Sequence, residues 1–112
     1  MGYRASHQYA RISPRKVGLV MDMIRGKPLE DALRVLDFSP RRAAKMVAKL
    51  LRSAMANADE QEADLEALYV RDARADQGPV LKRVSPRARG AADILHRPTC
   101  HLMVELEEET EG

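Results

Sequence analysis

The chain has 112 residues, which suits one compact domain and leaves little room for a second. Its single cysteine, Cys100, excludes an internal disulfide, and no apolar run approaches the ~20 residues that a membrane span needs. The first six residues also lack the apolar stretch of a signal peptide. We therefore expect a cytosolic protein, or one of an organelle that makes its own proteins.

The net charge of +2 conceals four blocks of alternating sign. Residues 1–58 hold 12 Lys and Arg against 4 Asp and Glu, and residues 59–76 hold 2 against 7. Residues 77–101 hold 5 against 1, and residues 102–112 hold none against 5. Such blocks indicate a basic face for a polyanion, although chance clustering on a solvated surface is the alternative.

The first elements in chain order are a strand and a helix. Residues 3–12 alternate loosely and are compatible with a β-strand. Ser13-Pro14 then predicts a helix start, because serine can accept hydrogen bonds from unpaired helix amides and proline suits the first helical position. Gly26 is a suitable end. Gly18 lies inside this helix at a cost of about 1 kcal/mol, which a closely approaching backbone would explain. The apolar stripe of the helix is Val17, Val20, Met21 and Ile24.

Two further helices follow. The second is expected over residues 29–36, where Glu30 and Asp31 in the first turn suit the helix dipole. Ser39-Pro40 repeats the earlier start signal and predicts a third helix over residues 41–58. Its apolar side consists of Ala44, Val47, Leu51, Ala54, Met55 and Ala58.

After an acidic linker, residues 59–64, the pattern changes to strands over residues 68–75 and 99–107. Between them, residues 76–98 hold too few large apolar side chains for a core. If this segment is an extended hairpin, each arm of ~10 residues reaches on the order of 30 Å and needs a partner to lie against. Residues 107–112 are expected to fray.

Both Ser-Pro helix starts are followed by cations, Arg15-Lys16 and Arg41-Arg42. Each cation at a helix N-terminus is unfavourable by roughly 0.3–1 kcal/mol, and a bound phosphate would remove the conflict. Side chains that lean away at no cost are the alternative. The third helix also has an uninterrupted basic stripe, which favours a track for a phosphate backbone over an ordinary solvated face. The stripe is Arg41, Lys45, Lys49 and Arg52.

A third Ser-Pro-Arg lies in residues 82–90, where arginines alternate with small residues. Arginine stacks on splayed bases, which suits folded RNA better than B-DNA. Catalytic patterns are weak, because Cys100 and His101 are adjacent and would point to opposite faces of a strand. His7, His96 and His101 have no metal-ligand spacing. We therefore expect no enzyme, no metal and no cofactor.

The sequence resembles the family of bacterial large-subunit ribosomal protein twenty-two over nearly its whole length. Two segments carry most of the resemblance, with Asn57 and Leu68-Tyr69-Val70 between them. The first is Arg11-Ile12-Ser13-Pro14-Arg15-Lys16-Val17 with Leu19-Val20 and Ile24-Arg25-Gly26-Lys27. The second is Gly78-Pro79, Leu81-Lys82-Arg83, Pro86-Arg87-Ala88-Arg89-Gly90, Ala92-Asp93-Ile94, Thr99 and His101.

The resemblance implies an α+β fold, with three helices packed on a three-stranded antiparallel sheet and a long protruding β-hairpin. It implies a single domain over residues 1–112, with the hairpin at residues 77–98. The function implied is that of a structural constituent of the large ribosomal subunit, which binds ribosomal RNA, assists early assembly and lines the polypeptide exit tunnel. The implied partners are large-subunit ribosomal RNA, neighbouring ribosomal proteins and the nascent polypeptide, with the chain a monomer within a bacterial-type cytoplasmic ribosome.

The resemblance, together with the basic patterns, also assigns residues. Those expected to bind ribosomal RNA are Arg11, Ser13, Arg15, Lys16, Lys27, Arg41, Arg42, Lys45, Lys49, Lys82, Arg83, Arg87, Arg89, Arg97 and His101. Those expected at the tunnel tip are Val84, Ser85, Pro86, Ala88, Gly90 and Ala91. The sequence departs from the family pattern at Gly18 and Ala91, where arginine is frequent, at Pro98, where a basic residue is usual, and at Cys100, where serine is. A free-standing nucleic-acid-binding regulator with the same basic face is the alternative.

Overall fold

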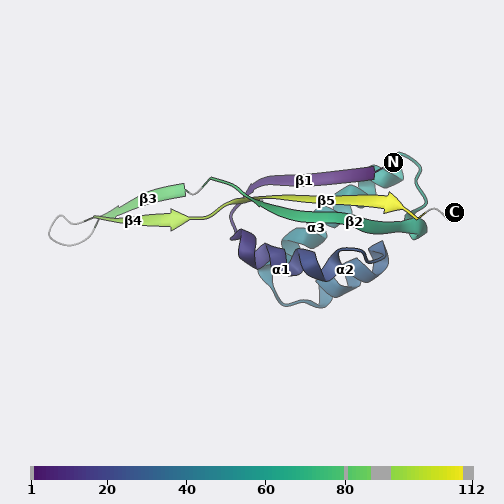
Figure 1. Cartoon of the computed structure of the whole chain (residues 1–112), viewed down its shortest axis with the longest axis horizontal. Helices are drawn as coiled ribbons and strands as arrows, with labels where there is room; N and C mark the ends of the chain where they lie inside the picture. Colours follow the sequence, from purple (N-terminus) through teal and green to yellow (C-terminus); the bar gives the residue numbers. More distant parts are fainter. Residues whose placement is uncertain (1, 80, 87–91, 110–112) are drawn as a thin grey trace.

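The computed structural model describes residues 2–79, 81–86 and 92–109, and the side chains of residues 2–79 and 98–109. Its elements in chain order are β1 (Gly2–Ala10), α1 (Pro14–Ile24), α2 (Leu29–Phe38), α3 (Arg42–Glu60), a 3₁₀ turn η1 (Leu65–Ala67), β2 (Leu68–Gln77), β3 (Leu81–Pro86), β4 (Ala92–Arg97) and β5 (Cys100–Glu108). Figure 1 shows the helices gathered against one sheet, with β3 and β4 extending away from it.

The sheet has the strand order β1-β5-β2, and both neighbours pair antiparallel with the central strand β5. Together with the three helices, this confirms the predicted α+β class. Strands β3 and β4 pair antiparallel with each other from Leu81↔Arg97 to Pro86↔Ala92. The molecule is elongated, with extents of 69 × 25 × 21 Å.

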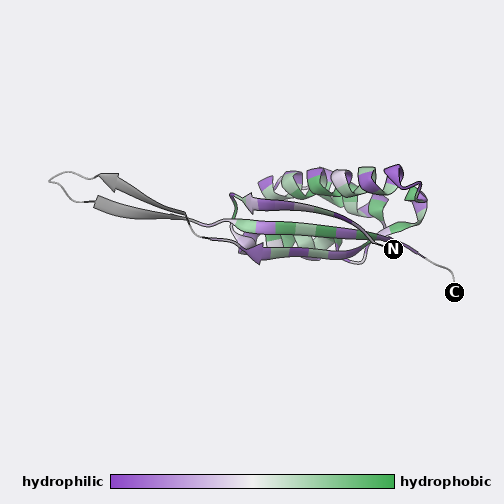
Figure 2. Cartoon of the chain, turned by 90° about the horizontal axis from the view of Figure 1, so that it is seen from above, coloured by the Kyte–Doolittle hydropathy of each residue, from purple (hydrophilic) through white to green (hydrophobic). Residues whose placement is uncertain are grey.

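Among the described residues, the buried core consists mainly of aliphatic side chains, together with Tyr3. α1 and α3 bury the predicted apolar stripes, except that Met55 is only half-buried. Leu102, Val104 and Leu106 of β5 are buried against the helices, and the alternation of hydrophobic and hydrophilic residues along the strands is visible in Figure 2. The only phenylalanine, Phe38, is 84% exposed at the end of α2.

Ser39 does not open the third helix as predicted. Its N–H donates to the Leu36 carbonyl at 3.2 Å, so Ser39 closes α2 instead. The N-cap of α3 is Arg41, and Arg42 is the first helical residue. Ser13 is the N-cap of α1, but its side chain makes no capping hydrogen bond. Proline favours an extended conformation in the residue before it, and both serines adopt one.

Two other local predictions are wrong. A side chain at Gly18 would meet no described atom of another segment within 4 Å of its Cβ, so close approach of another backbone does not explain this glycine. The alternation predicted for β1 ends after Ala5, because residues 6–9 are all exposed. His7 still pairs in register with Leu102, whereas Tyr9 lies beyond it, where the register with β5 shifts between His7 and Ala10.

The ordered elements also extend beyond their predicted ends. α3 continues past residue 58 to Glu60, within the expected linker. β5 reaches Glu108, and the Glu109 N–H donates to the Ala67 carbonyl at 2.7 Å. Fraying therefore does not begin at residue 107; residues 110–112 lie outside the described part of the chain.

Candidate nucleic-acid interface

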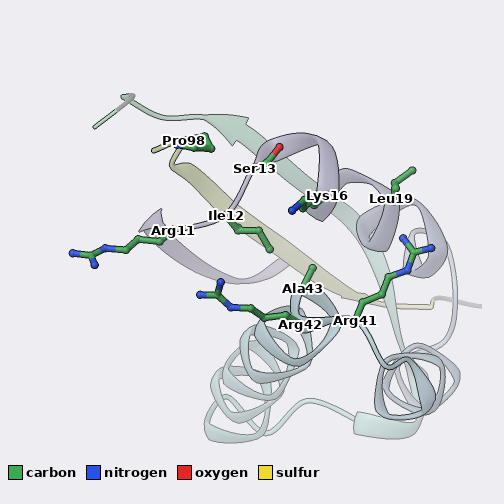
Figure 3. A pocket seen from close by; sticks show the side chains of 9 residues that line it. All are labelled: Arg11, Ile12, Ser13, Lys16, Leu19, Arg41, Arg42, Ala43 and Pro98. Atoms are coloured by element: carbon green, nitrogen blue, oxygen red, sulfur yellow. The ribbon is translucent and has the colours of Figure 1, made fainter. Parts of the chain in front are cut away.

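A groove of about 590 Å³ lies where the starts of α1 and α3 meet, and we call it the helix-start groove. Figure 3 shows that its side chains come from the β1–α1 connection, α1, the start of α3 and the segment before β5. It is lined by Arg11, Ile12, Ser13, Lys16, Leu19, Arg41, Arg42, Ala43 and Pro98. The two Ser-Pro-Arg segments that the sequence singled out separately therefore border one surface.

Buried apolar residues hold this arrangement. Ile12 and Ala43 are 8% and 4% exposed and anchor the chain on the two sides of the groove. Their neighbours Arg11 and Arg42, in contrast, are exposed. Packing of apolar neighbours thus brings cations to a common surface, although like charges repel each other there.

The helix dipoles add positive potential to the groove. Neither α1 nor α3 has an acidic residue in its first turn, whereas α2, which does not line the groove, has Glu30 and Asp31 there. Unpaired amides at a helix start and nearby cations both favour a bound anion. Cations therefore lie beside the positive ends of the α1 and α3 dipoles, as predicted. α2 differs, because acidic residues occupy its first turn.

Ion pairs divide the described cations into two groups. Six arginines pair with carboxylates, at N–O distances from 2.7 to 3.8 Å: Arg4, Arg25, Arg34, Arg52, Arg71 and Arg74. Within residues 2–79 and 98–109, the remaining cations have no carboxylate partner. These are Arg11, Arg15, Lys16, Lys27, Arg41, Arg42, Lys45 and Lys49. The second group coincides with the cations predicted to bind RNA in this part of the chain.

The prediction that no acidic residue relieves the repulsion within the basic stripe of α3 is wrong at Arg52. Asp37 at the end of α2 accepts hydrogen bonds from its guanidinium group at 3.0 Å on both carboxylate oxygens. Lys45 and Lys49 remain exposed on the turns of α3 that follow Arg41. Lys27 follows the C-terminal end of α1, so it is not brought to the helix-start groove.

The hairpin residues are described less fully. Only the backbone is described for Lys82, Arg83, Val84, Ser85 and Pro86 in β3 and for Arg97 in β4. Arg87, Ala88, Arg89, Gly90 and Ala91 lie outside the described residues. Their roles in binding RNA or lining the tunnel stay predictions.

His101 lies on the opposite face of β5 from Cys100, as expected for adjacent strand residues. Its Nδ1 accepts a hydrogen bond from the Tyr9 N–H at 3.1 Å, and the two rings form a T-shaped pair with centroids 4.8 Å apart. Burial raises the pKa of the Cys100 thiol, which opposes a nucleophilic role. The interaction with Tyr9 was missed, because the bulge that creates it has no signature in the alternation pattern.

Metal and membrane sites find no support in the described part of the chain. No three His, Cys, Asp or Glu side chains described there come together as a metal site requires. Of the described helices, none has the length and apolar character to cross a membrane.

The sequence matches a family model and many related proteins. The model described as ribosomal protein L22p/L17e matches residues 5–107. A relative named large ribosomal subunit protein uL22, from Geobacter sulfurreducens, is 54% identical over 88% of this chain and 89% of its own. A relative with the same name from Thermus thermophilus is 53% identical over 96% of both chains. The chain therefore belongs to the ribosomal protein L22p/L17e family.

Proposed function

We propose that this chain binds large-subunit ribosomal RNA through the helix-start groove and the basic face of α3, and thereby assists early assembly of the subunit. As a member of its family, it is a structural constituent of the large ribosomal subunit, with ribosomal RNA and neighbouring ribosomal proteins as partners. Membership of this family also confirms that the chain is not an enzyme.

One observation carries the RNA-binding proposal. The described cations without a carboxylate partner are those predicted to bind RNA, and four of them line one groove at two helix starts: Arg11, Lys16, Arg41 and Arg42. Phosphates would relieve the repulsion among these cations and would meet unpaired helix amides. Pro98 lines the same groove. By the family resemblance a basic residue is usual at this position, so this chain would make one fewer charged interaction there.

The hairpin, residues 77–98, is proposed to line the exit tunnel, with its tip at Val84, Ser85, Pro86, Ala88, Gly90 and Ala91 facing the nascent polypeptide. Support comes from the described strands β3 and β4, which pair only with each other and lie away from the sheet (Figure 1). A two-stranded hairpin is marginally stable in water, so a wall of RNA would support it. The chain would act as a monomer within the ribosome.

The salt dependence of RNA binding tests the groove. Replacing Arg41 and Arg42 together with Ala should lower the slope of log K against log salt by roughly 0.7–0.9 for each phosphate that the variant no longer neutralises. The matched control is Arg34→Ala, which removes an arginine paired with Asp31 on α2 and should leave the slope unchanged. Equal slopes for the double variant and the control would contradict the proposal.

Sedimentation separates a ribosomal constituent from a free-standing regulator. The protein should travel with the large subunit in a sucrose gradient of cell lysate and stay there after a wash at moderate salt. A regulator with the same basic face would remain near the top of the gradient.

A further inference from the structure

The end of β1 departs from regular pairing beside the base of the hairpin. β1 pairs with β5 as far as His7↔Leu102 and resumes at Ala10↔Cys100, so Gln8 and Tyr9 both stand opposite His101. This is a β-bulge, and Tyr9 adopts a φ of 58°, in the left-handed region. Figure 1 shows this end of β1 close to the point where the chain leaves the sheet for the hairpin.

Tyrosine is an unfavourable residue for this conformation. Glycine adopts a positive φ without steric cost, whereas a bulky side chain there is strained. Burial does not compensate, because Tyr9 is 60% exposed. The fold alone therefore gives little reason for an aromatic ring at this position.

The ring is nevertheless held in a defined place. The Tyr9 N–H donates to Nδ1 of His101 at 3.1 Å, and the rings meet edge to face at 87°. A single T-shaped neighbour covers at most one face of a ring. Tyr9 thus presents an exposed aromatic face at a fixed position, which is what a stacking partner requires.

We propose that Tyr9 stacks on an unpaired base of the bound RNA, an inference that rests on the proposed RNA-binding function. Arg11 follows two residues later and has no carboxylate partner among the described side chains. It also lines the helix-start groove, so a phosphate held by Arg11 would lie only two residues along the chain from Tyr9. RNA-binding proteins stack unpaired bases on aromatic rings in this way. Tyr9 therefore extends the interface from the phosphates to a base.

Two substitutions separate the ring from the backbone conformation. Tyr9→Gly fits the left-handed conformation, so the full chain should still unfold cooperatively while its affinity for transcribed large-subunit ribosomal RNA falls by roughly 10-fold. The salt slope should not change, since the same phosphates stay neutralised. Tyr9→Phe keeps the ring and should bind like the wild type. His7→Ala, which removes another exposed ring from β1, is the control and should also bind like the wild type.

The outcomes distinguish this inference from the function on which it rests. If the Arg41 and Arg42 double variant loses salt dependence while Tyr9→Gly keeps full affinity, the RNA interface stands and the stacking role is overturned. If Tyr9→Phe binds as weakly as Tyr9→Gly, the hydroxyl group matters and stacking is again overturned.

A photocrosslink identifies the partner directly. The change Tyr9→p-benzoylphenylalanine in the full chain, assembled into large subunits, should give a crosslink to an unpaired nucleotide of ribosomal RNA. A crosslink to a ribosomal protein, or none at all, would overturn the proposal.

Discussion

Thr99 shows how a single residue can position the hairpin relative to the sheet. It is 2% exposed, and its hydroxyl donates to the Pro79 carbonyl at 2.5 Å while its own carbonyl accepts from the Gly78 N–H at 2.9 Å. A Cβ at Gly78 would lie 2.7 Å from the Thr99 hydroxyl oxygen, so the segments that follow β2 and precede β5 approach too closely there for a larger residue. These two hydrogen bonds therefore tie the segment after β2 to the segment before β5, and we call this pair of bonds the Thr99 clamp. It restricts the direction in which the chain leaves the sheet.

The variant Thr99→Val tests this clamp. Valine preserves the shape but removes the hydroxyl donor, so the free energy of unfolding should fall by about 1 kcal/mol in urea denaturation. Ser6→Ala, which removes an exposed hydroxyl from β1, should change it by less than about 0.5 kcal/mol. Equal effects of the two substitutions would mean that the Thr99 hydrogen bond adds no stability.

Two tyrosines make stability depend on alkaline pH. Burial raises the pKa of Tyr3, assisted by its hydrogen bond to Glu108, and a hydrogen bond to Glu107 raises the pKa of Tyr69. The folded state therefore keeps both protons at a pH where the unfolded chain, with an ordinary value of 10.0, loses them. The stability from these groups is complete below that value and is lost as the pH rises through the higher folded values.

We expect the wild type to lose stability above about pH 10 more steeply than a double variant with Tyr3→Phe and Tyr69→Phe. Urea denaturation at a series of pH values measures this difference. Because all other groups are the same in both proteins, only the difference between the two pH profiles is informative. Parallel pH profiles would show that the two hydrogen bonds do not favour the protonated tyrosines.

At the scale of elements, α1 and α3 differ from α2 in the charge of their first turns. α2 has acidic residues there, as helix stability favours, whereas α1 and α3 have none and begin beside cations. Like-charged residues at a helix start reduce the stability of the free protein and strengthen the attraction for an anion. Stability and the proposed RNA binding therefore oppose each other at these two helix starts.

Arg42→Glu should change the two properties in opposite directions. A carboxylate at the first position of α3 interacts favourably with the helix dipole, so the free energy of unfolding should rise by roughly 0.3–1 kcal/mol while RNA affinity falls. Glu30→Lys makes the inverse change on α2, and it should lower stability without weakening RNA binding. Denaturation and filter binding measure both effects; a loss of stability in Arg42→Glu would contradict the argument.

At the scale of the molecule, the compact body and the hairpin differ in how their surfaces are covered. The body has helices packed against one face of its sheet, whereas the described strands of the hairpin pair only with each other.

Trypsin should therefore cut the free protein first in the hairpin, after residues such as Lys82 or Arg83. The same bonds should be protected in intact large subunits. Equal cleavage rates in the two states would exclude a hairpin lying against RNA.

The sequence predicted most of the elements and the core because apolar side chains recur at the helical and strand periods. Val17, Val20, Met21 and Ile24 are each buried, as are Leu102, Val104 and Leu106. Features that depend on contacts between distant residues were not predictable. Asp37 reaches Arg52 across a helix connection, and the bulge at Tyr9 depends on its pairing with β5.

The sequence predicted the individual cations of the candidate interface but not that they lie together. The cations Arg11, Lys16, Arg41 and Arg42 were each identified from the chemistry of the helix starts or from the family resemblance. That all four line one groove depends on the tertiary packing of Ile12 and Ala43, which periodicity does not reveal. Tyr9 was missed because an exposed aromatic residue in a strand has no distinctive local pattern.

The position of β5 has a consequence for how the protein folds during its own synthesis. β5 is the central strand of the sheet, yet it follows the other described elements along the chain. Until residues 100–108 emerge, β1 and β2 have no strand between them and the helices have no completed sheet to cover. Pairings this distant in sequence form slowly. The cationic segments are therefore synthesised well before the core can close, and chaperones or RNA could reach them while the domain is still unfolded.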